Sequence, residues 1–224
     1  MVSADLVVEA TAEGAARAAA GIVAAALRSA IAARGSASIA FSGGQTPTVM
    51  LAVLTELSLP WPQIHVFQVD ERVAPDGDAD RNSTALCHAL LDRVEAKAHL
   101  MDVTASDLVE SARRYAALLR QHEPLDVVHL GIGDDGHTAS WPPGAPVIDD
   151  ADNDVAIVGL FRKFVRMTIT PRVVDRARAV VVLVAGAEKA PVLARMLAGD
   201  RTVVATRVLG ARTVIVADAA ATTR

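Results

Sequence analysis

The sequence predicts an α/β protein in which helices flank a mostly parallel central sheet on both faces, giving three αβα layers. Short runs rich in Val, Ile and Leu alternate with longer runs rich in Ala and Leu, the order expected for strands joined by crossover helices. The composition is 52% hydrophobic and only 3% aromatic, which suits helices packed closely on a sheet. No repeat and no linker rich in Pro, Gly or Ser interrupts the chain, so we expect one α/β domain over residues 1–224.

Apolar runs and capping residues define the elements of the N-terminal half. The predicted strands are Leu6–Glu9, Ser38–Phe41 and Ile64–Val69. Thr11 is a favourable N-cap for a helix that continues to about Arg34. Pro47 suits the first turn of a second helix, which we expect to end near Leu57. A polar loop then leads into a predicted helix over Ser83–Leu91.

The C-terminal half continues the alternation. A helix is predicted over Ser106–Gln121, because Asp107 and Glu110 then lie in its first turn, where the helix dipole favours acids. Another helix is predicted over Glu188–Leu197. The predicted strands of this half are Leu125–Gly131, Val155–Leu160, Phe164–Ile169, Ala179–Val184 and Thr213–Ala217.

Charge and targeting signals exclude several classes of function. The formal net charge is −4 and no extended basic patch is present, so we expect no nucleic-acid partner. The single cysteine, Cys87, rules out an internal disulfide and fits a reducing compartment. Met1–Asp5 lacks the basic start of a secretory signal, and the apolar stretch Ala18–Leu27 is too short to span a bilayer. We therefore expect a cytoplasmic protein without a membrane partner, either a monomer or a small homo-oligomer.

Three polar loops each follow a predicted strand: Ser42–Pro47, Asp70–Pro75 and Gly131–Pro143. Parallel strands end at the same edge of a sheet, where open α/β sheets bind their ligands. We therefore expect the side chains of these loops to converge on one crevice.

The first loop predicts an anion site. Its glycines let the backbone approach a ligand closely, and the helix that follows adds free N–H donors and a partial positive charge. A phosphate monoester is the natural ligand, although a simple tight turn explains the motif equally well. The candidate binding residues here are Ser42, Gly43, Gly44, Gln45 and Thr46.

The second loop places two acids and a guanidinium at a strand end. Arg72 is suited to bind an oxyanion through a bidentate fork, next to Asp70. Taken alone, the motif favours a local ion pair instead.

The third loop carries the group best suited to proton transfer. His137 is the natural general base near neutral pH, and Asp135 is placed to orient it or to bind a sugar hydroxyl. The N–H groups of Gly133 and Gly136 are candidate donors to an oxyanion. Turn geometry alone does not explain three glycines together with Asp and His.

Two further cations are candidate ligands of a bound anion. Lys189 lies at a predicted helix start, where a cation is unfavourable for the helix, although a solvated lysine is also compatible with this position. Arg166 lies within an otherwise apolar strand, which indicates either an ion pair or a bound anion.

The other histidines receive no role. His129 lies within a strand and is interpreted as a core or edge histidine whose hydrogen bonds are satisfied. His65, His88, His99 and His122 are interpreted as isolated histidines, and no His/Cys group has the spacing of a zinc site, so no metal is expected.

Six short motifs, in order, make the chain resemble the 6-phosphogluconolactonases, part of the wider family that includes glucosamine-6-phosphate deaminase. Each is weak alone, but together they cover nearly the whole chain. They are Ser42-Gly-Gly-Gln-Thr-Pro47, Asp70-Glu-Arg-Val-Ala-Pro75, Asp80-Arg-Asn82, Gly131-Ile-Gly-Asp-Asp-Gly-His-Thr-Ala-Ser140, Arg166-Met-Thr-Ile-Thr170 and Gly186-Ala-Glu-Lys-Ala190.

The resemblance implies a Rossmann-like fold and hydrolysis of 6-phospho-D-glucono-1,5-lactone to 6-phospho-D-gluconate, step two of the oxidative pentose phosphate pathway, with no cofactor. It implies that His137 activates water, with Asp135 and Arg72 as further catalytic candidates. The resemblance places the phosphate near Gly43, Gly44, Arg166 and Lys189. It makes Asp70 and Asn82 further substrate-site residues.

One departure from the family pattern affects the loop of the proposed base. The family usually continues Leu-Phe-Pro after the serine, whereas this chain has Trp141-Pro-Pro143. Because the length is kept, His137 is expected to hold its register, while the pocket wall or a closing loop is expected to differ.

Two alternatives remain. The deaminase branch typically has Asp-Glu-Tyr where this chain has Asp70-Glu-Arg72, and a Glu where this chain has Pro142, so an amino-sugar-phosphate isomerase or deaminase would lack an acid. A non-catalytic sugar-phosphate-binding module would normally be fused to an output domain, and no basic recognition helix is visible.

Overall fold

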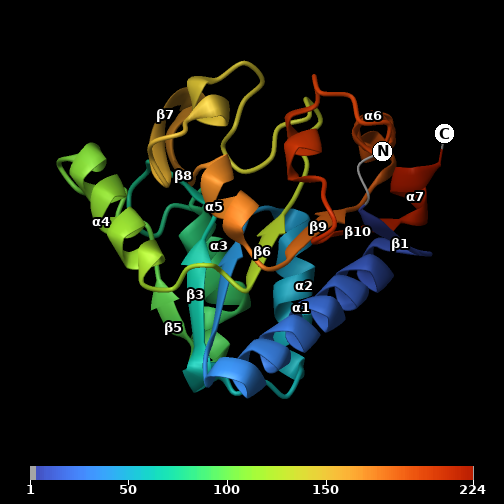
Figure 1. The fold of residues 1–224 in the computed structure, drawn as a ribbon, viewed down its shortest axis with the longest axis horizontal. Helices are drawn as coiled ribbons and strands as arrows, with labels where there is room; N and C mark the ends of the chain where they lie inside the picture. The colour runs from blue at the N-terminus through green and yellow to red at the C-terminus, as the bar shows by residue number, and fades with distance from the viewer. Residues whose placement is uncertain (1–3, 224) are drawn as a thin grey trace.

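A seven-stranded parallel sheet forms the centre of the computed structural model, which describes residues 4–223 (Figure 1). Of the N-terminal segment Met1–Asp5, the first three residues lie outside this range. The strand order is β1-β10-β9-β6-β2-β3-β5, and every pair within it is parallel. The strands are β1 (Asp5–Glu9), β2 (Ala37–Phe41), β3 (Ile64–Gln68), β5 (Lys97–His99), β6 (Val127–Leu130), β9 (Val180–Val184) and β10 (Thr213–Asp218).

Helices cover both faces of this sheet, as predicted. Alternate residues of one strand enter different cores: Ile39 and Phe41 of β2 pack with the first three helices, and Ala40 packs on the opposite side. One face carries α1 (Ala12–Arg34), α2 (Gln45–Glu56) and α3 (Asn82–Ala89). The other carries α4 (Leu108–Arg120), α5 (Pro171–Arg176) and α6 (Ala190–Leu197), and the short α7 (Ala219–Thr222) follows β10.

The long helix α1 has well-defined ends and a buried alanine face. The Thr11 hydroxyl accepts a hydrogen bond from Gly14 N at 3.0 Å, and Gly35 ends the helix in the left-handed conformation with φ 80°. Within residues 4–223, α1 is the one helix long and apolar enough to cross a membrane by length and composition. Its buried residues, which run from Ala15 to Ala30, pack in the core with sheet residues such as Ile39.

A small antiparallel sheet with the order β4-β8-β7 stands beside the carboxyl edge of the main sheet. Its strands are β4 (Asp70–Arg72), β8 (Phe164–Ile169) and β7 (Val155–Phe161). The prediction of Asp70–Arg72 as loop was wrong, because pairing with β8, rather than any apolar alternation, holds these polar residues extended. The β7–β8 hairpin turns at Arg162 and Lys163, whose φ angles of 44° and 81° match a two-residue type I′ loop.

The remaining differences from prediction concern short elements and helix ends. The three-residue strand β5 and the helices α5 and α7 have too few residues to show a period. Asp107 caps α4 by accepting from Glu110 N at 2.9 Å, so it lies before the helix and not in its first turn. A 3₁₀ turn over Ala187–Lys189 precedes α6, which therefore starts two residues later than predicted.

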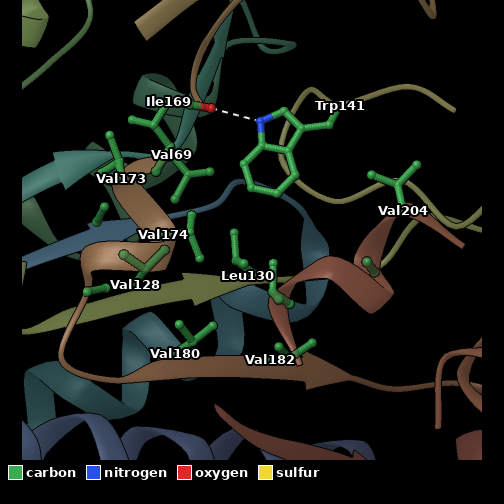
Figure 2. Packing of buried hydrophobic residues seen from close by; sticks show 14 of the residues in the cluster. Val69, Val128, Leu130, Trp141, Ile169, Val173, Val174, Val180, Val182 and Val204 are labelled. Atoms are coloured by element: carbon green, nitrogen blue, oxygen red, sulfur yellow. Dashed lines mark hydrogen bonds between the residues drawn. The ribbon is translucent and has the colours of Figure 1, made fainter. Parts of the chain in front are cut away.

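Trp141 anchors the loop after β6 in the core. Its side chain is fully buried, and Nε1 donates a hydrogen bond to the Ile169 carbonyl oxygen at 2.8 Å (Figure 2). The indole belongs to the same apolar cluster as Val69 and Val204. The tryptophan that departs from the family pattern therefore fills space in the core.

We expect Trp141→Phe to lower the free energy of unfolding by about 1–2 kcal/mol, because the Ile169 carbonyl oxygen loses a buried donor and keeps the Thr168 hydroxyl. Urea unfolding measures the change. The matched control is Trp61→Phe, since the Trp61 indole N–H has no hydrogen-bond partner among residues 4–223. Equal losses in the two variants would contradict the role of the hydrogen bond.

Candidate active site

The three predicted loops meet in one pocket of about 370 Å³ at the carboxyl edge of the parallel sheet. Two of the strands that lead into it, β2 and β3, are neighbours, and β6 pairs with β2 on its other side. The predicted site residues that line the pocket are Ser42, Gly43, Gly44, Thr46, Asp70, Arg72, Asn82, Gly133, His137, Arg166 and Lys189. The predicted convergence of the loops is therefore confirmed.

Two candidates, Gly136 and Asp135, do not line this pocket within the described part of the chain. The side chain of Gln45 lies outside what the structure describes. Gly136 adopts φ 86° and its carbonyl oxygen accepts from Ala205 N at 2.9 Å, so it shapes the turn. Asp135 stands behind His137 and contacts it directly.

His137 is held by both its backbone and its ring. Asp135 Oδ1 lies 2.5 Å from His137 Nδ1, and Gly133 N donates to the His137 carbonyl oxygen at 2.8 Å. A Cβ on Gly133 would lie 2.0 Å from the ring, so only glycine permits this approach. The Phe161 ring meets the imidazole edge-on at 5.1 Å. Because Nδ1 is engaged, Nε2 is the ring nitrogen left for chemistry.

Asp135 remains a carboxylate in this position. Burial alone would raise its pKa, but hydrogen bonding to His137 and electrostatic interaction with His137 and Arg162 bring the pKa below its ordinary value. Arg162 Nη2 lies 3.4 Å from Asp135 Oδ2 and also lines the pocket. Sequence reasoning missed Arg162, although its position between two predicted strands marks it as a turn residue.

Asp70 is the buried acid at the centre of the second loop. Ser140 Oγ donates to its Oδ2 at 2.6 Å, and Asn82 Nδ2 donates to its Oδ1 at 3.2 Å. Burial nevertheless raises the pKa of Asp70. Gly43 is required beside this group, because a Cβ there would lie 2.0 Å from the Asn82 amide oxygen. Loops far apart in sequence are thus joined through one carboxyl group.

Glu71 supports the site from beneath, a role that sequence reasoning missed. This fully buried acid accepts hydrogen bonds from Asn82 N at 2.7 Å and Ser83 N at 2.8 Å, at the start of α3. It also lies 3.0 Å from Arg81 Nε. The only sequence signal was the adjacency of the Asp-Glu-Arg and Asp-Arg-Asn motifs.

Arg72 and Arg166 face each other directly across the antiparallel β4–β8 ladder, and both line the pocket. Opposed like charges destabilise a sheet unless an anion accompanies them. Arg166 is buried, with Nη1 3.9 Å from Asp70 Oδ2, and Arg72 forms no ion pair within the described residues. The interpretation of Arg72 as part of a local ion pair is therefore wrong. Its Nη1 donates instead to the Asp80 carbonyl oxygen at 2.5 Å, and its Nε is buried without a partner.

Lys189 adds a further cation to the pocket lining. It lies at the N-cap of α6 and pairs with Asp134 of the third loop. Gly186, with φ 105°, turns the chain into this segment. The position predicted to be unfavourable for helix stability is thus occupied by a pocket-lining cation.

His129 proves to be an unsatisfied core histidine. It is fully buried in β6, neither ring nitrogen has a hydrogen-bond partner within the described residues, and burial lowers its pKa to about 3. The prediction that its hydrogen bonds are satisfied was wrong, and the neutral ring acts in packing beside Phe41.

Comparison with known proteins places these features in context. Residues 10–216 match the family described as glucosamine-6-phosphate isomerases/6-phosphogluconolactonase. A 6-phosphogluconolactonase of Synechocystis sp. is 40% identical over 182 residues, which cover 76% of this chain and 75% of that protein.

Solved structures share the fold over nearly the whole chain. A 6-phosphogluconolactonase from Shewanella baltica has a TM-score of 0.88 at 24% identity, covering 97% of this chain and 98% of its own. A monomeric glucosamine-6-phosphate deaminase has a TM-score of 0.87 at 19% identity, covering 97% and 98%. The fold is therefore common to both reactions, and the site residues must distinguish them.

Proposed function

Because the chain belongs to the glucosamine-6-phosphate isomerase/6-phosphogluconolactonase family, we propose that it hydrolyses 6-phosphogluconolactone to 6-phosphogluconate. The observation that carries the proposal is the pairing of a carboxylate-held histidine with a cationic wall in one pocket. The histidine suits water activation, and the cations suit a phosphate.

In the proposed mechanism His137 Nε2 takes a proton from water while the water oxygen attacks the lactone carbonyl carbon. The bond between this carbon and the ring oxygen then breaks, and the ring oxygen receives the proton from His137. A lactone is an activated ester, so no covalent nucleophile is needed. Asp135 is a positioning residue, because it acts through the imidazole and does not line the pocket.

The negative charge of the tetrahedral intermediate requires donors close to the carbonyl oxygen. The N–H of Gly133 is engaged by the His137 carbonyl oxygen, so we assign this role to the Thr138 hydroxyl, which lines the pocket and has no hydrogen-bond partner among the described residues. Gly136 supports the turn that carries His137, because its carbonyl oxygen accepts a hydrogen bond from Ala205 N.

The phosphate is assigned to the cationic side of the pocket. Arg72, Arg162, Arg166 and Lys189 line it, against the acids Asp70 and Glu188. A bound phosphate dianion stabilises the opposed pair Arg72 and Arg166 most, because its negative charge offsets the repulsion between the two guanidinium groups. The Ser42–Gly44 backbone lies in the same pocket at the entrance to α2.

The deaminase alternative lacks its acid at the corresponding position. Pro142 has no titratable group, and neither it nor its neighbour Trp141 lines the pocket. The chain departs from the family pattern at Trp141-Pro142, and we expected a different pocket wall there. The described lining residues do not include this segment, so the expected change of the wall is absent. The non-catalytic alternative does not account for the Asp135–His137 pair.

The test of the proposal is the hydrolysis of freshly made 6-phosphogluconolactone, followed by coupling to 6-phosphogluconate dehydrogenase or by NMR. We expect the purified protein to accelerate the reaction well above the spontaneous rate. Glucosamine 6-phosphate is the parallel substrate, and ammonia release from it would favour the deaminase. A rate equal to spontaneous hydrolysis would refute the lactonase.

Gly133→Ala is expected to lower kcat about 10- to 100-fold while the protein remains folded, because the new methyl displaces the His137 ring from its position. Steady-state kinetics and circular dichroism measure the two effects. Gly210→Ala is the matched control, since a Cβ there meets nothing within 4 Å. Unchanged activity in Gly133→Ala would show that the ring position does not matter.

A further inference from the structure

Three histidines that are far apart in the sequence come together in the structure. His65 lies in β3, His99 in the neighbouring β5, and His122 just after α4. One ring nitrogen of each lies within 4.8 Å of the others, and all three side chains are half-buried. The prediction that these residues are isolated was therefore wrong, because parallel pairing of β3 with the edge strand β5 and the end of α4 bring them together.

This histidine cluster is separate from the proposed lactone site. None of its members lines the pocket at the carboxyl edge. His65 is the second residue of β3, three residues before that strand ends, and His122 precedes the cis-Pro turn into β6. A ligand held here would leave His137 and the cationic wall untouched.

The backbone and the neighbouring rings hold the cluster in place. The Ser38 hydroxyl donates to the His122 carbonyl oxygen at 3.2 Å, and the Phe67 ring stacks on His99 at 4.5 Å between centroids. The His65 and His99 rings are parallel within 4°. The donors are thus ordered before any ligand arrives, which lowers the entropic cost of binding.

The spacing of the nitrogens is close to that of a metal site. His65 Nδ1 lies 2.9 Å from His99 Nε2. A tetrahedral zinc ion with Zn–N bonds near 2.0–2.1 Å separates its ligand nitrogens by about 3.4 Å. A ring movement of about 0.5 Å brings the His65 and His99 nitrogens to this separation. The third nitrogen has to move closer by at most about 1.4 Å.

We propose that His65, His99 and His122 bind a divalent transition-metal ion, with zinc as the reference, through three imidazole nitrogens and an open fourth position. Neutral imidazole is a common ligand for zinc, copper and nickel. With three protein ligands and one position for water or an anion, the set has the composition of an open zinc site, unlike a closed structural one.

Burial and neighbouring charges act on all three rings of the cluster. Burial, together with repulsion from His122, His99 and Lys97, lowers the pKa of His65 to about 4. Burial also lowers the pKa of His99 and that of His122. Lys97 acts on all three rings and is a cation whose charge opposes a bound metal ion.

Zinc titration of the metal-free full chain, by calorimetry and by competition with a chromophoric chelator, tests the proposal. We expect one zinc equivalent bound, with the dissociation constant raised about tenfold or more in His65→Gln and in His99→Gln. His88→Gln, at an exposed histidine, and His137→Ala, at the lactone site, are the controls that keep the wild-type affinity. Loss of binding in His137→Ala with retention in the cluster variants would overturn the proposal.

Histidine ring NMR provides a readout that a purely structural cluster would not move. Zinc should shift the ring nitrogens of His65, His99 and His122 and leave those of His88 and His129 in place. His65→Gln is expected to hydrolyse the lactone at the wild-type rate. Unshifted cluster nitrogens at saturating zinc, or equal zinc affinity in the wild type and the His65→Gln/His99→Gln double variant, would show that the rings only pack together.

Discussion

His137→Ala is expected to lower kcat for lactone hydrolysis about 10²- to 10⁴-fold, because the variant has no general base to take the proton from water. The imidazole is the only titratable ring that lines the pocket among the described residues. Asp135 cannot replace it, since Asp135 does not line the pocket and loses its partner in the variant. KM is expected to change little, because the cations assigned to the phosphate remain.

The measurement is steady-state kinetics beside urea unfolding. His137 is only partly buried, so we expect the folded state to lose about 1 kcal/mol or less. His88→Ala is the matched control at an exposed histidine and should keep wild-type activity. Near-wild-type activity in His137→Ala would reject the base assignment while leaving lactone hydrolysis itself standing.

Asp135→Asn separates orientation from proton transfer. The amide keeps the size of the side chain but loses the charge that faces Nδ1 and Arg162. An intermediate loss of kcat, smaller than that of His137→Ala, is therefore the result expected of a positioning residue. A loss equal to that of the histidine variant would instead assign Asp135 a direct part in proton transfer.

The sequence predicted the fold well where elements are long and apolar. The helix from Thr11 to Arg34 and strands such as β9 are determined by local capping and continuous hydrophobic runs. The strand β4 was missed because its three residues are polar and owe their extended form to pairing with β8, more than ninety residues later. Such pairing leaves no local period.

The site shows the same division between local and long-range information. Loop chemistry predicted the convergence at His137, Asp70 and Ser42, since parallel strands end at one edge. The opposition of Arg72 and Arg166 depends on the register of the small sheet, which no motif encodes. The cluster around His65 is similarly invisible along the chain, because three separate elements supply one histidine each.

Lys189→Met is expected to lower kcat/KM for the phosphorylated lactone about 10- to 150-fold, the cost of one charge-assisted hydrogen bond of about 1.5–3 kcal/mol. Plain gluconolactone, which lacks the phosphate, should lose no more than about twofold, within the scatter of surface substitutions. The difference between the two substrates isolates the phosphate contact from the chemistry at His137. Asp134, the present partner of Lys189, is exposed and tolerates the loss.

Lys163→Met is the matched control for this charge. Lys163 lies on the β7–β8 hairpin, pairs with Asp80 at 2.8 Å, and does not line the pocket. Lys163→Met should therefore leave the hydrolysis of both substrates unaffected, because it removes only an exposed ion pair outside the pocket. Arg166→Met should repeat the selectivity of Lys189→Met, with an added loss of stability, since it leaves the buried Asp70 without its arginine. Equal losses of kcat/KM on both lactones in the Lys189 variant would show that Lys189 does not bind the phosphate. Arg72 would then be the next cation to test.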